Sequence, residues 1–271
     1  MKTTHRLLVV FAAALVMLSS TGCSKLKARD HLNKGVQAYK NSKFEQAIDH
    51  FQQAVALDPT LINARLYLAT AFAQQYIPGA DTPDNNRFGE QAIDQYKQVL
   101  QVDPKNINSI KGIAYLYLQM KKFPLSKEYY KKASEADPND PEPYYSVAVI
   151  DWTQTYVPRQ EERAKLGMKP DESLPAKDKK ACATIKEQNT ANVQEGIDNL
   201  NKALQLRPDY DDAMAYLNLM YRERADIQCD DPAARSADLK TADEWVDKTM
   251  ATKKAKAEKQ PAGAIVMDQK Q

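Results

Sequence analysis

The sequence predicts an all-α fold made of repeated helical hairpins, and three observations lead to this class. Residues 107–140 form two segments with helical spacing of apolar residues, joined by a short turn. The same pattern recurs on both sides of these 34 residues. The chain of 271 residues also contains only eight glycines, which favours helix over sheet. A pattern that repeats at this period is typical of an α-solenoid.

The segment 107–140 shows why one repeat folds as a hairpin. Apolar residues follow an i, i+3, i+4, i+7 pattern from Ile110 to Tyr117, which defines one helix face. Ala114 in the first half and Ser126 in the second are small, so the two helices can cross closely. Pro138 ends the second helix because proline lacks an N–H and disfavours helix before it.

Other copies follow in register, and two of them are opened by insertions. The second copy carries 11 extra residues around 77–88, whose Pro, Gly, Asp and Asn content predicts a polar loop. The fourth carries 36 extra residues. There we expect a helix through Leu166, a turn over 167–174 and unbroken helix from Pro175 to Leu206. The fourth hairpin is therefore predicted to be elongated and to project from the array.

The predicted organisation has a targeting segment, five repeats and a tail. The fifth copy lacks the terminal proline and is predicted to be a degenerate capping unit. The expected ranges are a signal peptide at 1–22, a lipid-anchored linker at 23–27, a solenoid at 28–254 with repeats at 28–61, 62–106, 107–140, 141–210 and 211–254, and a disordered tail at 255–271.

Small residues at positions 8, 20 and 27 of the copies, with proline at position 32, resemble the tetratricopeptide repeat family. In the segment 107–140 these positions hold Ala114, Ser126, Ala133 and Pro138. The resemblance implies a right-handed α-solenoid with a concave groove that binds a protein or a peptide. We expect no cofactor, because no cofactor-binding motif occurs in the sequence.

One stripe on the first helix of each repeat lines the groove in that family. Tyrosine and tryptophan offer contact area on such a stripe, and amides can bond a peptide backbone. The alternative is that some of these side chains pack between repeats. The candidate groove residues are Tyr39, Asn63, Asn108, Lys111, Tyr115, Tyr145 and Trp152.

The N-terminus has the pattern of an export signal. Lys2 and Arg6 precede an apolar run of 12 residues, which is short for a membrane span. Small residues then lead to Cys23, which resembles the lipobox of bacterial lipoproteins, although Ser20 stands where that family usually has leucine. The resemblance implies lipidation at Cys23, with Ser24 favouring the outer membrane over the inner and the protein facing the periplasm. A simply cleaved signal, giving a soluble periplasmic adaptor, and a retained anchor are the alternatives.

Two further cysteines, Cys182 and Cys229, suggest a disulfide in an oxidising compartment. The second helix of the fourth repeat and the first helix of the fifth are predicted antiparallel neighbours. Their register leaves the two cysteines about 9 Å apart along the helix axis, which a loop at Cys229 can absorb. Two unrelated thiols, or a thiol-active pair, are the alternatives.

The sequence offers little that supports catalysis, a metal site or nucleic-acid binding. No nucleophile motif or glycine-rich phosphate loop occurs. His31 and His50 stand at helix positions where nothing in the sequence pairs them, and we expect surface or packing roles. The 38 basic and 36 acidic residues are nearly balanced, which argues against nucleic acid as a partner. We therefore expect no enzyme activity, no metal and no small-molecule substrate.

Overall fold

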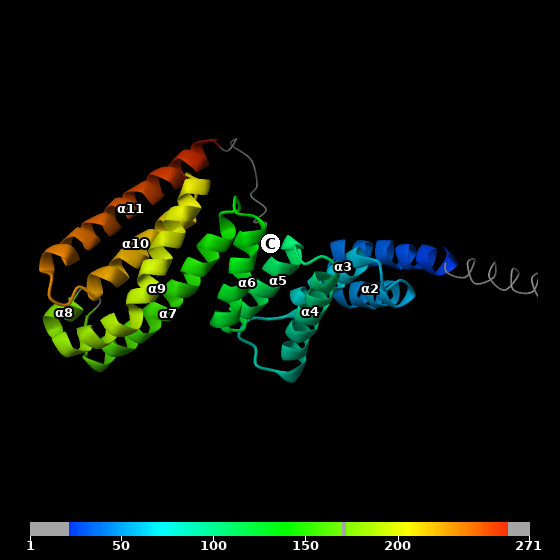
Figure 1. Cartoon of the computed structure of the whole chain (residues 1–271), viewed down its shortest axis with the longest axis horizontal. Coiled ribbons are helices and arrows are strands. Elements are labelled where there is room, and N and C mark those ends of the chain that lie inside the picture. The colour runs from blue at the N-terminus through cyan, green and yellow to red at the C-terminus, as the bar shows by residue number, and fades with distance from the viewer. Residues whose placement is uncertain (1–21, 170–171, 260–271) are drawn as a thin grey trace, which may run out of the picture. The chain divides into compact units, whose positions relative to one another are not determined.

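The computed structural model describes residues 22–169 and 172–259, and every regular element in these ranges is a helix. The helices follow one another as antiparallel pairs joined by short connections (Figure 1). The chain divides into two compact units between Tyr129 and Tyr130, inside helix α6. This all-α hairpin architecture is the one that the sequence predicts.

The first unit contains a helix at 22–40 followed by α2 to α5 and the first part of α6. Small residues let these helices approach closely. Ser126 is fully buried and donates its hydroxyl to the Ala114 carbonyl, 2.8 Å away, across the α5–α6 hairpin. A Cβ at Gly35 would collide with the Phe51 ring, so glycine permits the first crossing. The bounds are α2 Phe44–Leu57, α3 Ile62–Gln75, α4 Pro83–Val102, α5 Ile107–Gln119 and α6 Phe123–Ala136.

The insertion of the second repeat is only partly a loop, which corrects the prediction for 77–88. Helix α4 begins at Pro83, inside the segment expected to be irregular. Thr82 caps α4 by accepting a hydrogen bond from the Asn85 N–H. Pro83 suits the first helical position, because the N–H of that position has no partner within the helix and proline lacks one. The cap and the proline together start the helix earlier than polar composition alone suggests.

The second unit is dominated by long helices that pack as α7 on α9, α9 on α10 and α10 on α11 (Figure 1). The predicted unbroken helix from Pro175 is interrupted at Asp178. The Asp178 carboxylate caps α9 by accepting from the N–H groups of Lys180 and Ala181, and an N-cap residue has non-helical backbone. The bounds are α7 Glu142–Lys165, α8 Leu174–Lys177, α9 Lys179–Leu206, α10 Asp211–Asp226 and α11 Pro232–Lys259.

Both ends of the array are more helical than the sequence suggests. Residues 23–27, expected to be a linker, belong to the helix at 22–40. Residues 255–259, expected to be the start of a disordered tail, belong to α11. Good helix formers extend each terminal helix beyond the last repeat position. The signal peptide proposed for 1–22 and the remainder of the tail lie outside the described residues, except for Gly22.

Candidate partner-binding site

The first unit presents part of the predicted stripe to solvent. Asn63 on α3 and Asn108 on α5 are exposed, and Lys111 is half-buried. The Tyr115 side chain is 49% exposed, which is high for a large aromatic residue. Tyr39 is half-buried and meets the Phe44 ring edge to face, with centroids 5.3 Å apart.

In the second unit the stripe residues belong to an aromatic cluster between α7 and α10. Tyr145 lies 4.9 Å from Tyr210 and 5.5 Å from Tyr216, measured between ring centroids. Trp152 lies 4.8 Å from Tyr156 and 5.6 Å from Tyr216. Burial raises the pKa of the Tyr145 phenol, and Tyr216 and Tyr210 add to this effect. Tyr145 and Trp152 therefore contribute to packing between helices of this unit.

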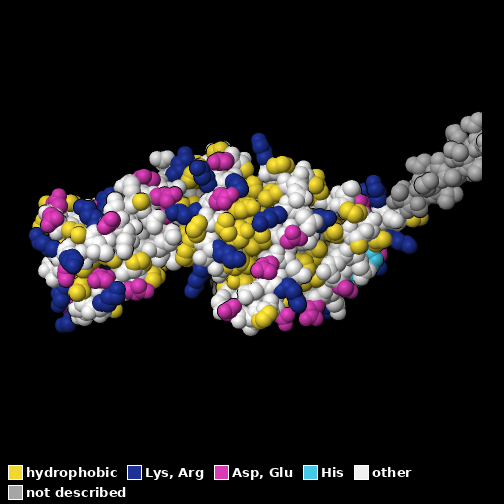
Figure 2. Space-filling model, turned by 60° about the horizontal axis from the view of Figure 1, so that its bottom comes forward, with side chains coloured by type: hydrophobic (Ala, Val, Ile, Leu, Met, Phe, Trp, Pro, Cys, Tyr) yellow, Lys and Arg dark blue, Asp and Glu magenta, His cyan; other side chains and the backbone are white. Residues whose placement is uncertain are grey.

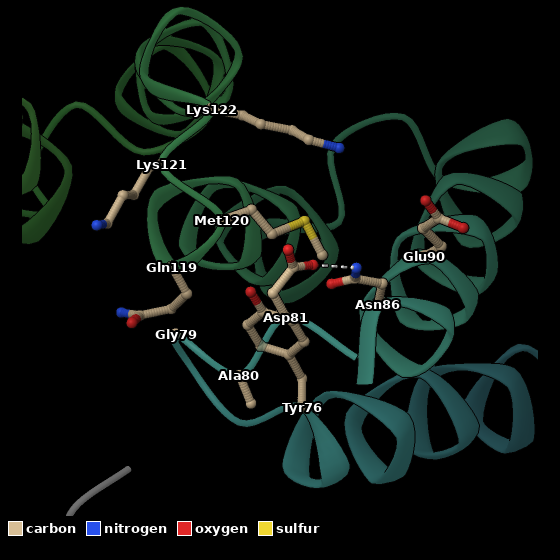
Figure 3. A pocket seen from close by; sticks show the side chains of 10 residues that line it. All are labelled: Tyr76, Gly79, Ala80, Asp81, Asn86, Glu90, Gln119, Met120, Lys121 and Lys122. Carbon is tan, nitrogen blue, oxygen red and sulfur yellow. Dashed lines mark hydrogen bonds between the residues drawn. The ribbon is translucent and has the colours of Figure 1, made fainter. Parts of the chain in front are cut away.

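A pocket of about 420 Å³ opens between the insertion loop and the α5–α6 turn of the first unit (Figure 3). Tyr76 and Met120 form its apolar floor, while Lys122 extends over it toward the side that carries Glu90. A Cβ at Gly89 would collide with the Met120 methyl group, so the absence of a side chain at Gly89 allows Met120 to pack there. The pocket is within the size range of ligand-binding clefts and combines apolar and charged lining.

The wall of this pocket is held in shape by one side chain, Asn85. Its amide nitrogen donates to the carbonyls of Ile77, at 2.9 Å, and Ala80, at 2.7 Å. Its oxygen accepts from the Ile77 N–H at 2.6 Å, and the side chain is almost fully buried. Gly79 takes the left-handed conformation with φ of 81° in the turn between them. Sequence reasoning missed the pocket, although the Thr82 cap and the proline after it could have indicated an ordered loop.

A buried ion-pair network links α7 to α10 in the second unit. Arg159 on α7 contacts Glu223 at 2.8 Å and Asp226 at 2.6 Å, both on α10. Arg163 lies 3.3 Å from the same Asp226 oxygen and is 4% exposed. Burial raises the pKa of Glu223 to about 7, against the lowering effect of Arg159. Every charge here has a partner of opposite sign, as buried charges require.

The two cysteines of the second unit are joined by a disulfide beside this network. The Cys182 and Cys229 sulfurs are 2.03 Å apart, and the Cα atoms are 5.7 Å apart. Cys182 is fully buried and Cys229 is 9% exposed. The bond connects α9 to the loop after α10, as the predicted register of the two helices requires. Cys23 is a free, exposed thiol in the first turn of the helix at 22–40.

Within residues 22–169 and 172–259 no group of three or more His, Cys, Asp or Glu side chains is arranged to hold a metal ion. In the same ranges, no helix combines the length and apolar character that crossing a membrane requires. Basic and acidic side chains are interspersed on the face shown in Figure 2. That face therefore offers no extended field of one sign for a polyanionic partner.

The close crossing of small residues in these hairpins agrees with two family-model matches. The chain carries tetratricopeptide repeats. Sequence models described as "Tetratricopeptide repeat" match residues 28–61 and residues 89–150. No curated protein matches the chain by sequence.

Several solved structures share the fold. A MamA crystal structure has a TM-score of 0.58 at 11% identity and covers 87% of this chain and 97% of its own. MamA from Desulfovibrio magneticus RS-1 has a TM-score of 0.56 at 16% identity, covering 84% and 96%. YrrB, described as a TPR protein with an unusual peptide-binding site, has a TM-score of 0.50 at 13% identity, covering 84% and 90%. At these identities the likeness concerns the fold.

Proposed function

We propose that this protein is a non-catalytic scaffold that binds a peptide or protein segment along the first unit while a lipid on Cys23 holds it at the bacterial envelope. The tetratricopeptide repeats and their structural neighbours support a role in protein interaction generally. A peptide-binding site in YrrB, a neighbour in fold, supports the choice of a peptide. Assembly of an envelope or secretion complex is the kind of process that such a scaffold serves.

The observation that carries the proposal is the exposed aromatic and amide stripe of the first unit. Tyr115 keeps about half its surface in solvent although burial would be favourable. Asn63 and Asn108 are exposed on neighbouring hairpins and can bond the backbone of an extended peptide. Their hairpin helices are packed and preformed, so little ordering is needed when a partner binds.

The stripe proposal is tested with full-length protein crosslinked in native membranes and with purified candidate partners. Tyr115→Ala is expected to weaken binding at least tenfold, because exposed aromatic anchors dominate such interfaces. Val102→Ala is the matched control, since Val102 is 68% exposed but lies outside the stripe. If Tyr115→Ala and the control retain the same partners at equal affinity, the stripe is not the binding surface.

The anchor is supported by the N-terminal pattern and by the position of Cys23 next to the first repeat. Cys23 is followed after five residues by the fully buried Ala28, about 7.5 Å along the helix. A lipid at Cys23 would therefore hold the first repeat close to the membrane without a flexible linker. Labelling with palmitate separates this anchor from a soluble periplasmic adaptor: we expect label in the wild type and none in Cys23→Ala. An unlabelled wild-type protein would end the lipoprotein proposal.

The burial of the Cys182–Cys229 bond favours a structural role over thiol chemistry. Reactive disulfides are exposed to the thiolate that attacks them, whereas these sulfurs lie in the hydrophobic core of the second unit. We expect the bond to resist mild reductant in the folded protein. Rapid reduction by a small thiol without unfolding would support the thiol-active alternative instead.

A further inference from the structure

The first hairpin brings together the only two histidines in the described part of the chain. His31 lies on the helix at 22–40 and His50 on α2. Their Nδ1 atoms are 3.3 Å apart, and the ring centroids are 5.5 Å apart. Both side chains are half-buried, and histidine surface is visible on the first unit in Figure 2. They are 19 residues apart in the chain, so only the packing of the two helices brings them together.

The 3.3 Å distance between the two Nδ1 atoms is compatible with two arrangements. Without a metal, one Nδ1–H can donate to the unprotonated Nδ1 of the other ring. With a metal, two imidazole nitrogens bound to one tetrahedral ion at about 2.0–2.1 Å stand about 3.4 Å from each other. The observed spacing therefore equals the bite of a chelating pair, and adjustment of the His side-chain torsions is sufficient to aim both lone pairs at one ion.

One acidic residue, Asp30, directly precedes His31 in the chain. Asp30 is exposed and forms an i, i+4 ion pair with Lys34 at 2.7 Å. Such an exposed pair is weak and can rearrange when a divalent ion arrives.

We propose that His31 and His50 form a binding site for Zn²⁺, the late divalent transition metal that takes tetrahedral coordination. Imidazole nitrogen is a preferred ligand for this class of ion, whereas Mg²⁺ and Ca²⁺ prefer oxygen. The chain supplies two nitrogens, and water completes the coordination. The bound ion links the helix at 22–40 to α2 and stiffens the hairpin next to Cys23. This role is separate from peptide binding on the stripe.

The experiment uses the untagged full-length protein with Cys23→Ser, so that neither a histidine tag nor the free thiol binds metal. Zn²⁺ is titrated in competition with a chromogenic chelator. We expect one ion per chain, and at least a tenfold loss of affinity in His31→Gln and in His50→Gln. Glu45→Gln, which removes an exposed acid from the first turn of α2, is expected to leave the affinity unchanged.

A second measurement keeps the test independent of folding defects. Circular dichroism without metal shows whether each glutamine variant retains the helix content of the parent. Metal is expected to raise the thermal midpoint of the parent and to leave that of the double variant unchanged. The proposal is overturned if the parent binds no ion, or if the folded double variant binds the ion as tightly as the parent.

Discussion

Removing the Cys182–Cys229 disulfide should destabilise the second unit and leave the first unit unchanged. The bond closes a loop with a sequence separation of 47 residues. In the chain-entropy description, closing a loop of this length raises the free energy of the unfolded chain by about 4 kcal/mol. We therefore expect Cys182→Ala with Cys229→Ala to lower the free energy of unfolding of the second unit by about 2–4 kcal/mol.

The two tryptophans make this prediction measurable. Trp152 and Trp245 both lie in the second unit and pack against its core. Urea unfolding followed by tryptophan fluorescence therefore reports on that unit alone. Hydrogen exchange of α2, in the first unit, serves as the internal control and should not change. The parent carries Cys23→Ser to prevent disulfide exchange.

Two results would refute the reasoning. The tryptophan transition could move by less than about 1 kcal/mol, which would show that the bond does not restrict the unfolded chain as the loop length requires. Alternatively, mass spectrometry of non-reduced peptides from the native envelope could show two free thiols. Either result would leave the buried ion pairs as the main constraint on the hairpin.

Three further perturbations test the remaining contacts. Arg163→Met leaves Asp226 paired with Arg159 but removes the donor to the carbonyls of Lys169 and Glu172. It should cost about 1–3 kcal/mol by tryptophan-monitored unfolding, while the exposed control Lys165→Met should change little. The folded-state pKa of Glu223 is raised to about 7 from 4.5, so its contribution to the free energy of unfolding is present below pH 4.5 and is lost as pH rises to 7. Glu223→Gln should therefore flatten the decline of stability over this pH range. An unchanged dependence of stability on pH would contradict the assignment. Asn85→Ala removes three hydrogen bonds to the loop backbone and should open residues 77–82 to limited proteolysis. The control Asn33→Ala, at an exposed position of the helix at 22–40, should leave the loop resistant.

Local signals explain why the repeat pattern could be predicted from the sequence. Ala114 and Ser126 were assigned to a close helix crossing by size alone, and the structure places them in contact there. The errors are local as well. Composition marked the second insertion as loop to residue 88, but the Thr82 cap starts α4 at Pro83. Asp178 likewise ends α8 and caps α9, where the sequence pattern predicts one continuous helix.

The candidate sites depended on partners that are distant in sequence. Tyr145 and Trp152 share their stripe with Tyr115, yet only Tyr115 is largely exposed, because α10 covers the other two with Tyr216. Helical spacing identifies the face on which a side chain lies. It does not identify which neighbouring helix lies over that face. The pocket beside Met120 could not be predicted from the sequence for the same reason, since its walls come from different hairpins.

The sequence by itself determined the helical hairpins, their small-residue crossings and the helices that bear Cys182 and the two arginines. These properties follow from periodicity within 30 to 40 residues, over which local geometry repeats. Tertiary structure alone decided that His31 meets His50 and that Arg159 meets Asp226, 67 residues away. Such pairs depend on the rotation and offset of packed helices, and those are set by the summed packing of many side chains rather than by either partner.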